Sequence, residues 1–324
     1  MTLTVTKLSR RFGPKWILKD VSFEATGGSV LGLFGSQGSG KTTLLRIIAG
    51  LETQDGGTIS LDGRELPVGR SDRRVEFIPH VPASPFLRRA FGGALSDTVD
   101  AAHRQADAIR AALSGDARVV LLDDPLCFLD RASKEALFEN LRDAVKGSGR
   151  IVVFAANDIE DLYEVCGEVA ILDEGEIAQS GAPEMIYEEP YSSKIAALTG
   201  RINLIEARRL TSSKTDVPEF VTIDGEHRLF ARRSELGRLG AINRNVLLGI
   251  RPESISISFG ASFPEDNLLR ATVTEVKFLG STTLVVLDAG GLRLEALVLR
   301  LVGLTPGEEC MVGLPPDRIA VLSS

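Results

Sequence analysis

The chain has 324 residues, and at roughly 150 residues per domain this length predicts two domains and excludes a single small module. Hydrophobic residues make up 44% of the chain and charged residues 25%, so the composition is that of a folded globular protein and excludes a disordered polymer. The 44 acidic side chains outnumber the 37 basic ones and give a net charge of −7, which argues against nucleic acid as a partner.

The first 200 or so residues alternate β-branched apolar runs with longer helical stretches. This alternation predicts an α/β fold with a mostly parallel sheet and crossover helices. A small antiparallel layer is predicted at Leu3–Leu8, Ser22–Ala25 and Thr58–Leu61. Strands of the parallel sheet are nearly continuous in apolar residues, because both their faces are covered, and are predicted at Ser29–Phe34, Arg118–Leu122, Arg150–Ala155 and Glu168–Leu172.

A phosphate-binding pattern, G-x-x-x-x-G-K-[ST], is matched at every fixed position by residues 35–42. It lies between a predicted buried strand and a predicted helix at Thr42–Ile48, and its glycines allow the backbone N–H groups to point at phosphate oxygens. We therefore expect Lys41 to reach the β- and γ-phosphates of ATP and Thr42 to ligate Mg²⁺. The predicted nucleotide-binding residues of this loop are Gly35, Ser36, Gln37, Gly38, Ser39, Gly40, Lys41, Thr42 and Thr43.

A single amphipathic helix is predicted before the next buried strand, because apolar residues repeat there at helical spacing. Its N-cap is predicted at Ser96 or Asp97, and Gly115 is predicted to cap its C-terminal end. The repeating residues are Leu95, Val99, Ala102, Ala106, Ile109 and Leu113.

Two acidic residues, Asp123 and Asp124, follow the buried strand Arg118–Leu122. Together with the phosphate loop, this position predicts that Asp123 holds the Mg²⁺ ion. Asp124, the next residue, is predicted to polarise the water that attacks the γ-phosphate.

Beyond about residue 200 the helical periodicity fades, and short alternating runs joined by turn residues predict a small all-β barrel. The predicted domains are 1–202 and 203–324. Basic side chains of the barrel, Arg251, Arg270 and Arg293, are interpreted as solvated or paired, not as an oxyanion site. Strands are predicted at Phe220–Ile223, Arg228–Ala231, Val246–Ile250, Ala271–Val276, Thr283–Leu287 and Leu292–Val298.

Four blocks of sequence carry a family resemblance: the phosphate loop, LLDDPLCFLD at 121–130, AILDEGEIAQSGAPEMIYEEP at 170–190 and LGIRPESISI at 248–257. Together they resemble the ATP-binding subunits of ABC importers with a C-terminal TOBE domain. The resemblance implies a P-loop NTPase sheet followed by an OB-like barrel, ATP and Mg²⁺ as cofactors, and membrane permease subunits as partners. It also implies a cytoplasmic location at the inner face of the cell membrane, which fits three widely spaced cysteines and the lack of a membrane-spanning run.

The same resemblance assigns roles to further residues. Phe12 falls where the family stacks an aromatic ring on adenine, with Trp16 as the rival, and Asp130 falls on the loop that crosses the dimer interface. Asp124 replaces the family's catalytic glutamate, Asn157 replaces its switch histidine, and His80 lies near the glutamine that senses the metal and the attacking water. Since aspartate is shorter than glutamate by about 1.5 Å, and since an amide cannot carry the charge or the proton of an imidazole, we expect slow hydrolysis.

The family's LSGGQ signature is absent from this chain. Lys41 and Asp123 are only 82 positions apart in the sequence, fewer than in relatives, so the resemblance implies a shortened helical subdomain and a trimmed groove for the permease. The slot that aligns with the signature, Val99–His103, has no glycine, and Asp100 there would repel a γ-phosphate.

In this family each ATP lies between the phosphate loop of one subunit and the signature of the other. A homodimer of this chain would lack a signature in both sites, so we expect it to pair with a complete ATPase subunit, with impaired or partner-dependent hydrolysis. The alternative is a nucleotide-binding regulatory or structural protein whose barrel is an interaction or ligand module. An ordinary homodimeric importer ATPase is the third interpretation, and the transported solute stays open.

Overall fold

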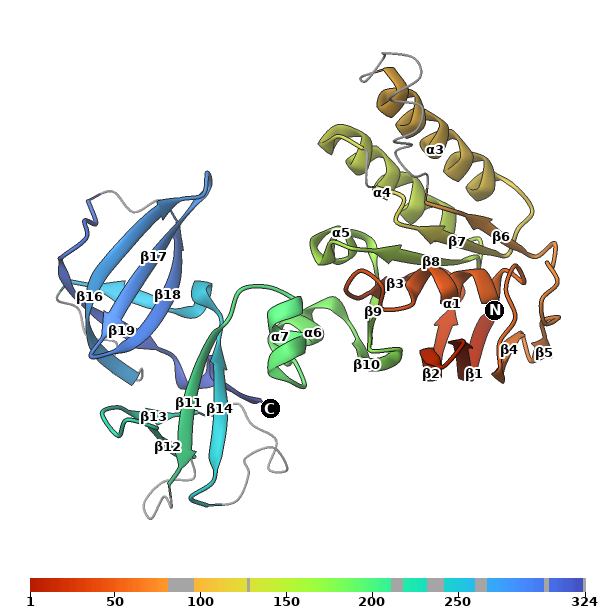
Figure 1. The fold of residues 1–324 in the computed structure, drawn as a ribbon. Helices are drawn as coiled ribbons and strands as arrows, with labels where there is room; N and C mark the ends of the chain where they lie inside the picture. The colour runs from red at the N-terminus through yellow and green to blue at the C-terminus, as the bar shows by residue number, and fades with distance from the viewer. Residues whose placement is uncertain are drawn as a thin grey trace. The chain divides into compact units, whose positions relative to one another are not determined.

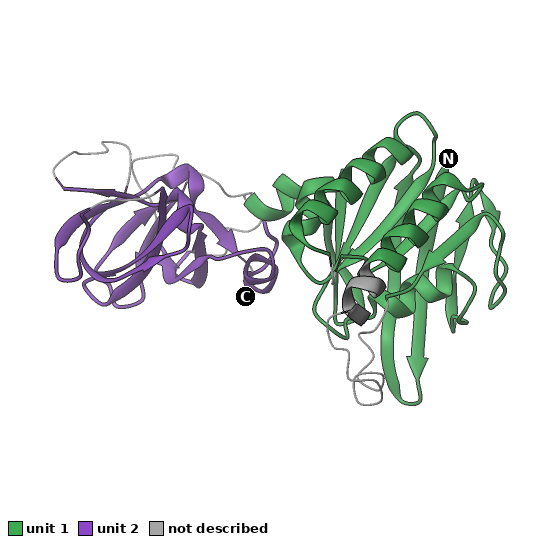
Figure 2. Ribbon diagram, turned by 90° about the horizontal axis from the view of Figure 1, so that it is seen from above, with its two compact units in different colours: residues 1–188 green, residues 189–324 purple. Residues whose placement is uncertain are grey.

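The computed structural model describes residues 1–80, 96–126, 129–210, 218–231, 242–259, 267–299 and 303–322, with the backbone alone for 96–102. The chain forms two compact units, Met1–Glu188 and Glu189–Ser324 (Figure 2). The predicted domain boundary at 202/203 falls later, between α7 (Ser193–Leu198) and the strand β11 (Asn203–Arg209), and stays a prediction. Of the residues named above, Leu95 lies outside the described part of the chain, as do positions 127 and 128 of the block at 121–130.

Unit 1 is an α/β fold with two sheets (Figure 1), so the predicted fold class of this half is confirmed. The antiparallel sheet has the order β2-β1-β4-β5, and the larger sheet has the order β10-β9-β3-β8-β7-β6, in which only β10 is antiparallel to its neighbour. The strands of the first sheet are β1 (Thr2–Phe12), β2 (Lys15–Thr26), β4 (Gly56–Leu61) and β5 (Arg64–Glu65). Those of the second are β3 (Ser29–Phe34), β6 (Val75–Ile78), β7 (Val119–Asp123), β8 (Ile151–Ala156), β9 (Glu168–Asp173) and β10 (Glu176–Gly181).

Helices cover the parallel sheet. One apolar core joins α1 (Lys41–Ile48), the antiparallel sheet and alternate residues of the parallel strands, such as Val119 and Leu121. Because side chains alternate between the faces of a strand, the intervening residues face away from this core. The helices α4 (Arg131–Val145) and α5 (Ile159–Val165) pack against β3 and β8, and α6 (Pro183–Glu188) packs against β9 and β10. None of the helices in the described ranges is long and apolar enough to span a membrane.

The predicted amphipathic helix is confirmed as α3 (Ser96–Ser114), but its C-terminal end differs from the prediction. Gly115 does not adopt the left-handed conformation of a glycine cap. The guanidinium of Arg150 instead donates hydrogen bonds to the carbonyls of Leu113 and of Gly115, the latter at 2.6 Å. The side chain of Arg150, the residue before β8, therefore bonds carbonyls that a helix leaves free at its C-terminus.

The part of unit 2 that follows α7 is all-β, as predicted, and its described residues form two five-stranded antiparallel sheets around one core. The sheet order β13-β12-β11-β14-β20 contains β12 (Glu219–Thr222), β13 (Arg228–Phe230), β14 (Asn245–Ile250) and β20 (Ala320–Leu322). The order β15-β19-β16-β17-β18 contains β15 (Ser256–Ser258), β16 (Asn267–Phe278), β17 (Thr282–Ala289), β18 (Leu292–Leu299) and β19 (Glu309–Leu314). Two 3₁₀ turns, Pro252–Ser254 and Pro316–Arg318, complete it.

The basic residues of unit 2 have separate environments. Arg251 is buried, and its guanidinium donates hydrogen bonds of 3.0 Å to the carbonyl oxygens of Ala196 and Arg201 and to the hydroxyl of Thr199. Arg293 lies 3.7 Å from a carboxylate oxygen of Glu295, and Arg270 is exposed. Arg251 thus ties the segment around α7 to the end of β14, which agrees with its interpretation as a paired residue.

We expect Arg251→Met to lower the free energy of unfolding of unit 2 by about 3 kcal/mol or more, since it removes a charged donor from three buried acceptors while keeping most of the volume. Scanning calorimetry of the full chain measures this change. Arg270→Met, an exposed control on β16, is expected to change the stability by less than about 0.5 kcal/mol. Equal effects of the two variants would contradict the role of Arg251.

Candidate functional site

The phosphate loop joins the end of β3 to the start of α1, so its backbone leads directly into a helix N-terminus. Gly38 and Gly40 have φ angles of 82° and 112°, which side chains disfavour. A Cβ on Gly35 would lie 2.3 Å from the carbonyl oxygen of Leu172, so no larger residue fits there. The backbone conformation and the close packing therefore favour glycine at these three positions. The resulting loop is a cradle open to phosphate oxygens.

Lys41 is buried, with 7% of its surface exposed, and its ammonium group lies against the loop. Its Nζ donates to the carbonyl oxygens of Gly35 at 2.6 Å and Ser36 at 3.1 Å. Burial lowers the pKa of Lys41, while the nearby charges of Asp123 and Asp124 oppose this shift. The loop thus holds a cation at the place where a phosphate chain would need one.

Thr42 and Asp123 meet although they are far apart in the sequence. The hydroxyl of Thr42 donates to Oδ1 of Asp123 at 3.1 Å. Burial raises the pKa of Asp123, and the hydrogen bond from Thr42 and the charge of His80 oppose this shift. These are hard oxygen donors of the kind that Mg²⁺ prefers, and their separation suits two neighbouring ligands of an ion with bonds of about 2.0–2.1 Å. The residues present therefore fit Mg²⁺.

Asp124 lies beside two polar side chains from neighbouring strand ends. Its Oδ2 accepts a hydrogen bond of 2.7 Å from Nδ2 of Asn157, and lies 3.7 Å from Nδ1 of His80. Asp124 has a φ of 46°, a left-handed conformation that is costly for a residue with a side chain and directs its carboxylate differently from that of Asp123. His80, which the resemblance places near the glutamine that senses the metal, therefore lies at the carboxylate of Asp124, and a role as a metal ligand stays a prediction.

Lys41, Thr42, Asp123, Asp124, His80 and Asn157 line one cleft of about 680 Å³. Phe12 lines it and Trp16 is not among its described lining residues, which favours Phe12 as the stacking residue; the guanidinium carbon of Arg10 lies 4.8 Å from the centroid of the Phe12 ring. Gly35, Ser36 and Ser39 lie in the loop but not on the cleft surface. The sequence-predicted residues that line it are Phe12, Gln37, Gly38, Gly40, Lys41, Thr42, Thr43, His80, Asp123, Asp124 and Asn157.

Four lining residues were missed by the sequence analysis: Ile17, Arg46, Phe77 and Pro79. Arg46 is four residues after Thr42 and three after Thr43 in α1, so helical spacing could have indicated it, whereas no such spacing links Ile17 to a predicted site residue. Phe77 and Pro79 belong to β6 and its end, and this strand was not predicted.

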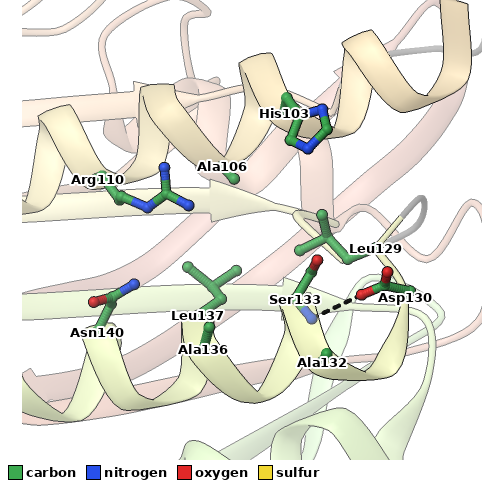
Figure 3. A pocket seen from close by; sticks show the side chains of 10 residues that line it. All are labelled: His103, Ala106, Arg110, Leu129, Asp130, Ala132, Ser133, Ala136, Leu137 and Asn140. Carbon is green, nitrogen blue, oxygen red and sulfur yellow. Dashed lines mark hydrogen bonds between the residues drawn. The ribbon is translucent and has the colours of Figure 1, made fainter. Parts of the chain in front are cut away.

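The segment that aligns with the family signature is helical, because α3 already begins at Ser96. From Asp100 onward the backbone N–H groups of such a helix donate to carbonyls four residues earlier, so they are not available to a phosphate. The last residue of the slot, His103, lines a separate hollow of about 470 Å³ between α3 and α4 (Figure 3). Across this hollow, Asp130 caps α4 by accepting a hydrogen bond of 2.8 Å from the backbone N–H of Ser133.

Comparisons with known proteins agree with this geometry. A sequence profile described as ABC transporter matches residues 18–91, and one described as TOBE domain matches residues 248–322. The chain is 28% identical to the spermidine/putrescine import ATP-binding protein PotA 2 of Pseudomonas aeruginosa, over 94% of this chain and 92% of that protein. It is 28% identical to the sulfate/thiosulfate import ATP-binding protein CysA of Escherichia coli, over 98% and 94%, and 30% identical to CysA of Rhodopseudomonas palustris, over 73% and 80%.

The first profile matches a segment of unit 1 and the second a segment of unit 2, and PotA 2 aligns over 94% of the chain, which includes both units. The cleft of unit 1 contains a phosphate loop, a buried lysine and a pair of oxygen donors suited to Mg²⁺. The chain belongs to the ATP-binding subunits of ABC transporters that carry a TOBE domain, a family that binds ATP with Mg²⁺.

Proposed function

We propose that this chain binds ATP with Mg²⁺ in the cleft of unit 1 and powers the uptake of a solute through the permease subunits of an importer, at the cytoplasmic face of the membrane. The observation that carries the proposal is the hydrogen bond of 3.1 Å between Thr42 and Asp123 beside the buried Lys41. The names of the relatives include importers of polyamines, which are cations, and of sulfate, an anion. The charges of these two solutes are opposite, so the relatives do not identify the solute that this chain helps to transport.

Each part of the cleft has a role in binding. The loop N–H groups and the positive N-terminus of α1 bind phosphate oxygens, and the ammonium of Lys41 turns from the loop carbonyls to the β- and γ-phosphates. Phe12 stacks on the adenine with the face opposite Arg10. Thr42 and Asp123 hold Mg²⁺, which when bound neutralises charge that develops on the phosphates.

Hydrolysis is slow in this proposal because Asp124 and Asn157 are a weak catalytic pair. The carboxylate of Asp124 is shorter than that of glutamate and is bonded to the amide of Asn157 at 2.7 Å, so it is held back from an attacking water. An amide donates a hydrogen bond to a γ-phosphate but does not take up a proton. His80, on the other side of Asp124, supports the position of this carboxylate.

We expect Asp124→Glu to raise ATP turnover by about tenfold in the assembled transporter, because misplacement of a catalytic group by about 1 Å can cost about a hundredfold. Steady-state phosphate release measures the change, and Asp124→Asn, which lacks a carboxylate, serves as the control without gain. An unchanged rate for Asp124→Glu would shift the limitation to Asn157 or to the missing signature.

A second, complete ATPase subunit supplies the missing signature in this proposal. The helical slot in α3 offers no glycine loop to a γ-phosphate, so two copies of this chain would leave both nucleotides without a signature. In an asymmetric pair, the phosphate loop of this chain meets the signature of the partner, and the opposite site is degenerate.

The test of this pairing is co-purification of the tagged chain with the products of its neighbouring genes. We expect a second ATPase chain and permease chains in the complex, and ATP turnover that this chain alone lacks. A complex that contains only copies of this chain and permeases would contradict the asymmetric pair. Tight ATP binding without turnover, even beside a partner ATPase, would favour the regulatory alternative instead.

A further inference from the structure

One buried polar side chain of unit 1 lies outside the roles described so far. Gln105, on α3, is 5% exposed, and its Nε2 donates a hydrogen bond of 3.2 Å to the carbonyl oxygen of Pro79. The next residues on the same face of the helix, Ile109 and Ala112, are fully buried and apolar. Since a buried amide costs free energy unless it is hydrogen-bonded, Gln105 is an unfavourable choice for a site that only needs packing.

Pro79 is the residue before His80, and both follow β6. In the parallel pairing of β6 with β7, Ile78 lies opposite Leu122, so Pro79 and His80 leave the sheet next to Asp123 and Asp124. This places Nδ1 of His80 at 3.7 Å from Oδ2 of Asp124. A contact with the Pro79 carbonyl therefore acts within one residue of the catalytic edge of the cleft.

A bond to this carbonyl controls the direction of the chain at His80. The ring of Pro79 restricts its φ, and the peptide that joins Pro79 to His80 is planar. The Gln105 bond orients this peptide plane, which leaves the backbone of His80 few alternative positions. A different face of α3, with His103, Ala106 and Arg110, borders the hollow toward α4 (Figure 3), whereas Gln105 bonds to Pro79 after β6.

We propose that Gln105 is a positioning residue: its amide holds the Pro79 carbonyl and thereby keeps the imidazole of His80 beside Asp124. Through this bond, the position of α3 affects the reacting edge of the cleft by way of the backbone at Pro79. The kinetic part of the inference rests on the proposed hydrolysis of ATP in this cleft, whereas the positioning of His80 does not.

The first test follows the histidine rings by NMR in the full chain labelled at histidine. The chain has three histidines, and a His80→Gln variant identifies the signals of His80. We expect Gln105→Leu, which fills similar space, and Gln105→Glu, which places an oxygen against the Pro79 carbonyl, to shift or broaden the His80 signals. His227, in unit 2, should not change. Thermal unfolding of each variant confirms that it folds.

Arg104→Leu is the matched control, since Arg104 is exposed and precedes Gln105 on the same helix. It should leave the His80 signals in place. If both Gln105 variants fold and the His80 signals match those of the unchanged chain, the inference is wrong. The same holds if Arg104→Leu moves these signals as much as the Gln105 variants do.

The second test measures ATP turnover in the assembled complex. We expect Gln105→Leu to lower turnover about tenfold while the affinity for ATP changes less than twofold, and to cause no further loss when His80→Ala is already present. Losses that multiply in the double variant would show that Gln105 acts apart from His80 and would overturn the inference. A complex without any turnover would contradict the proposed hydrolysis, and the histidine signals would still decide the role of Gln105.

Discussion

Lys41→Ala is expected to lower the affinity for ATP by at least about a hundredfold. The ammonium group of Lys41 makes two hydrogen bonds to loop carbonyls, at 2.6 and 3.1 Å, and each charge-assisted bond transferred to phosphate is worth about 1.5–3 kcal/mol. Calorimetric titration of the purified chain with Mg·ATP measures the loss.

The control for this prediction is Lys146→Ala, which removes an exposed lysine at the C-terminal end of α4. Its affinity for ATP should equal that of the unchanged chain, and both variants should remain folded by circular dichroism. An unchanged affinity in folded Lys41→Ala would refute the assignment of the phosphate cradle.

Asp123→Asn is expected to abolish the effect of Mg²⁺ on ATP binding and to lower turnover in the assembled complex by at least about a hundredfold. Asparagine keeps an oxygen that accepts the bond from Thr42 but removes the charge that holds a divalent cation. We expect Mg²⁺ to raise the affinity for ATP in the unchanged chain, and the ratio of affinities with Mg²⁺ and with EDTA to be near one in the variant.

In the absence of nucleotide, the Asp123→Asn variant should be no less stable than the unchanged chain. Burial disfavours the charged form of Asp123, as the raised pKa of this residue indicates. Asp124→Asn, which changes the adjacent acid, is the matched control and should retain the Mg²⁺ effect on binding. If the Mg²⁺ effect disappears with Asp124→Asn and persists with Asp123→Asn, the roles of the two acids are reversed.

The phosphate cradle was predictable because its residues are consecutive and its glycines have local reasons, the φ angles of Gly38 and Gly40 and the close approach at Gly35. The position of Asp123 at the end of a buried strand was predictable from the apolar run before it. Its contact with Thr42, 81 positions away, follows from a rule of parallel sheets, since β3, β8 and β7 are neighbours and their carboxyl ends share one edge.

Other features had no local signal. The strand β6 has four residues, most of them half-buried, so neither a continuous apolar run nor strict alternation marked it. The end of α3 was predicted at a glycine, whereas the side chain of Arg150, the residue before β8, bonds the carbonyls there. A glutamine in an amphipathic helix is ordinarily a surface residue, and only the packing of α3 on β6 shows that Gln105 is buried.

The residue pattern alone was sufficient to predict the two-part architecture, the phosphate loop and the acidic pair, because each depends on spacing within a short stretch of chain. The cluster of Asp124, Asn157 and His80 and the bond from Gln105 to Pro79 required the folded chain. The order and the register of the strands bring these residues within hydrogen-bond reach. Residue spacing along the sequence specifies neither the strand order nor the register.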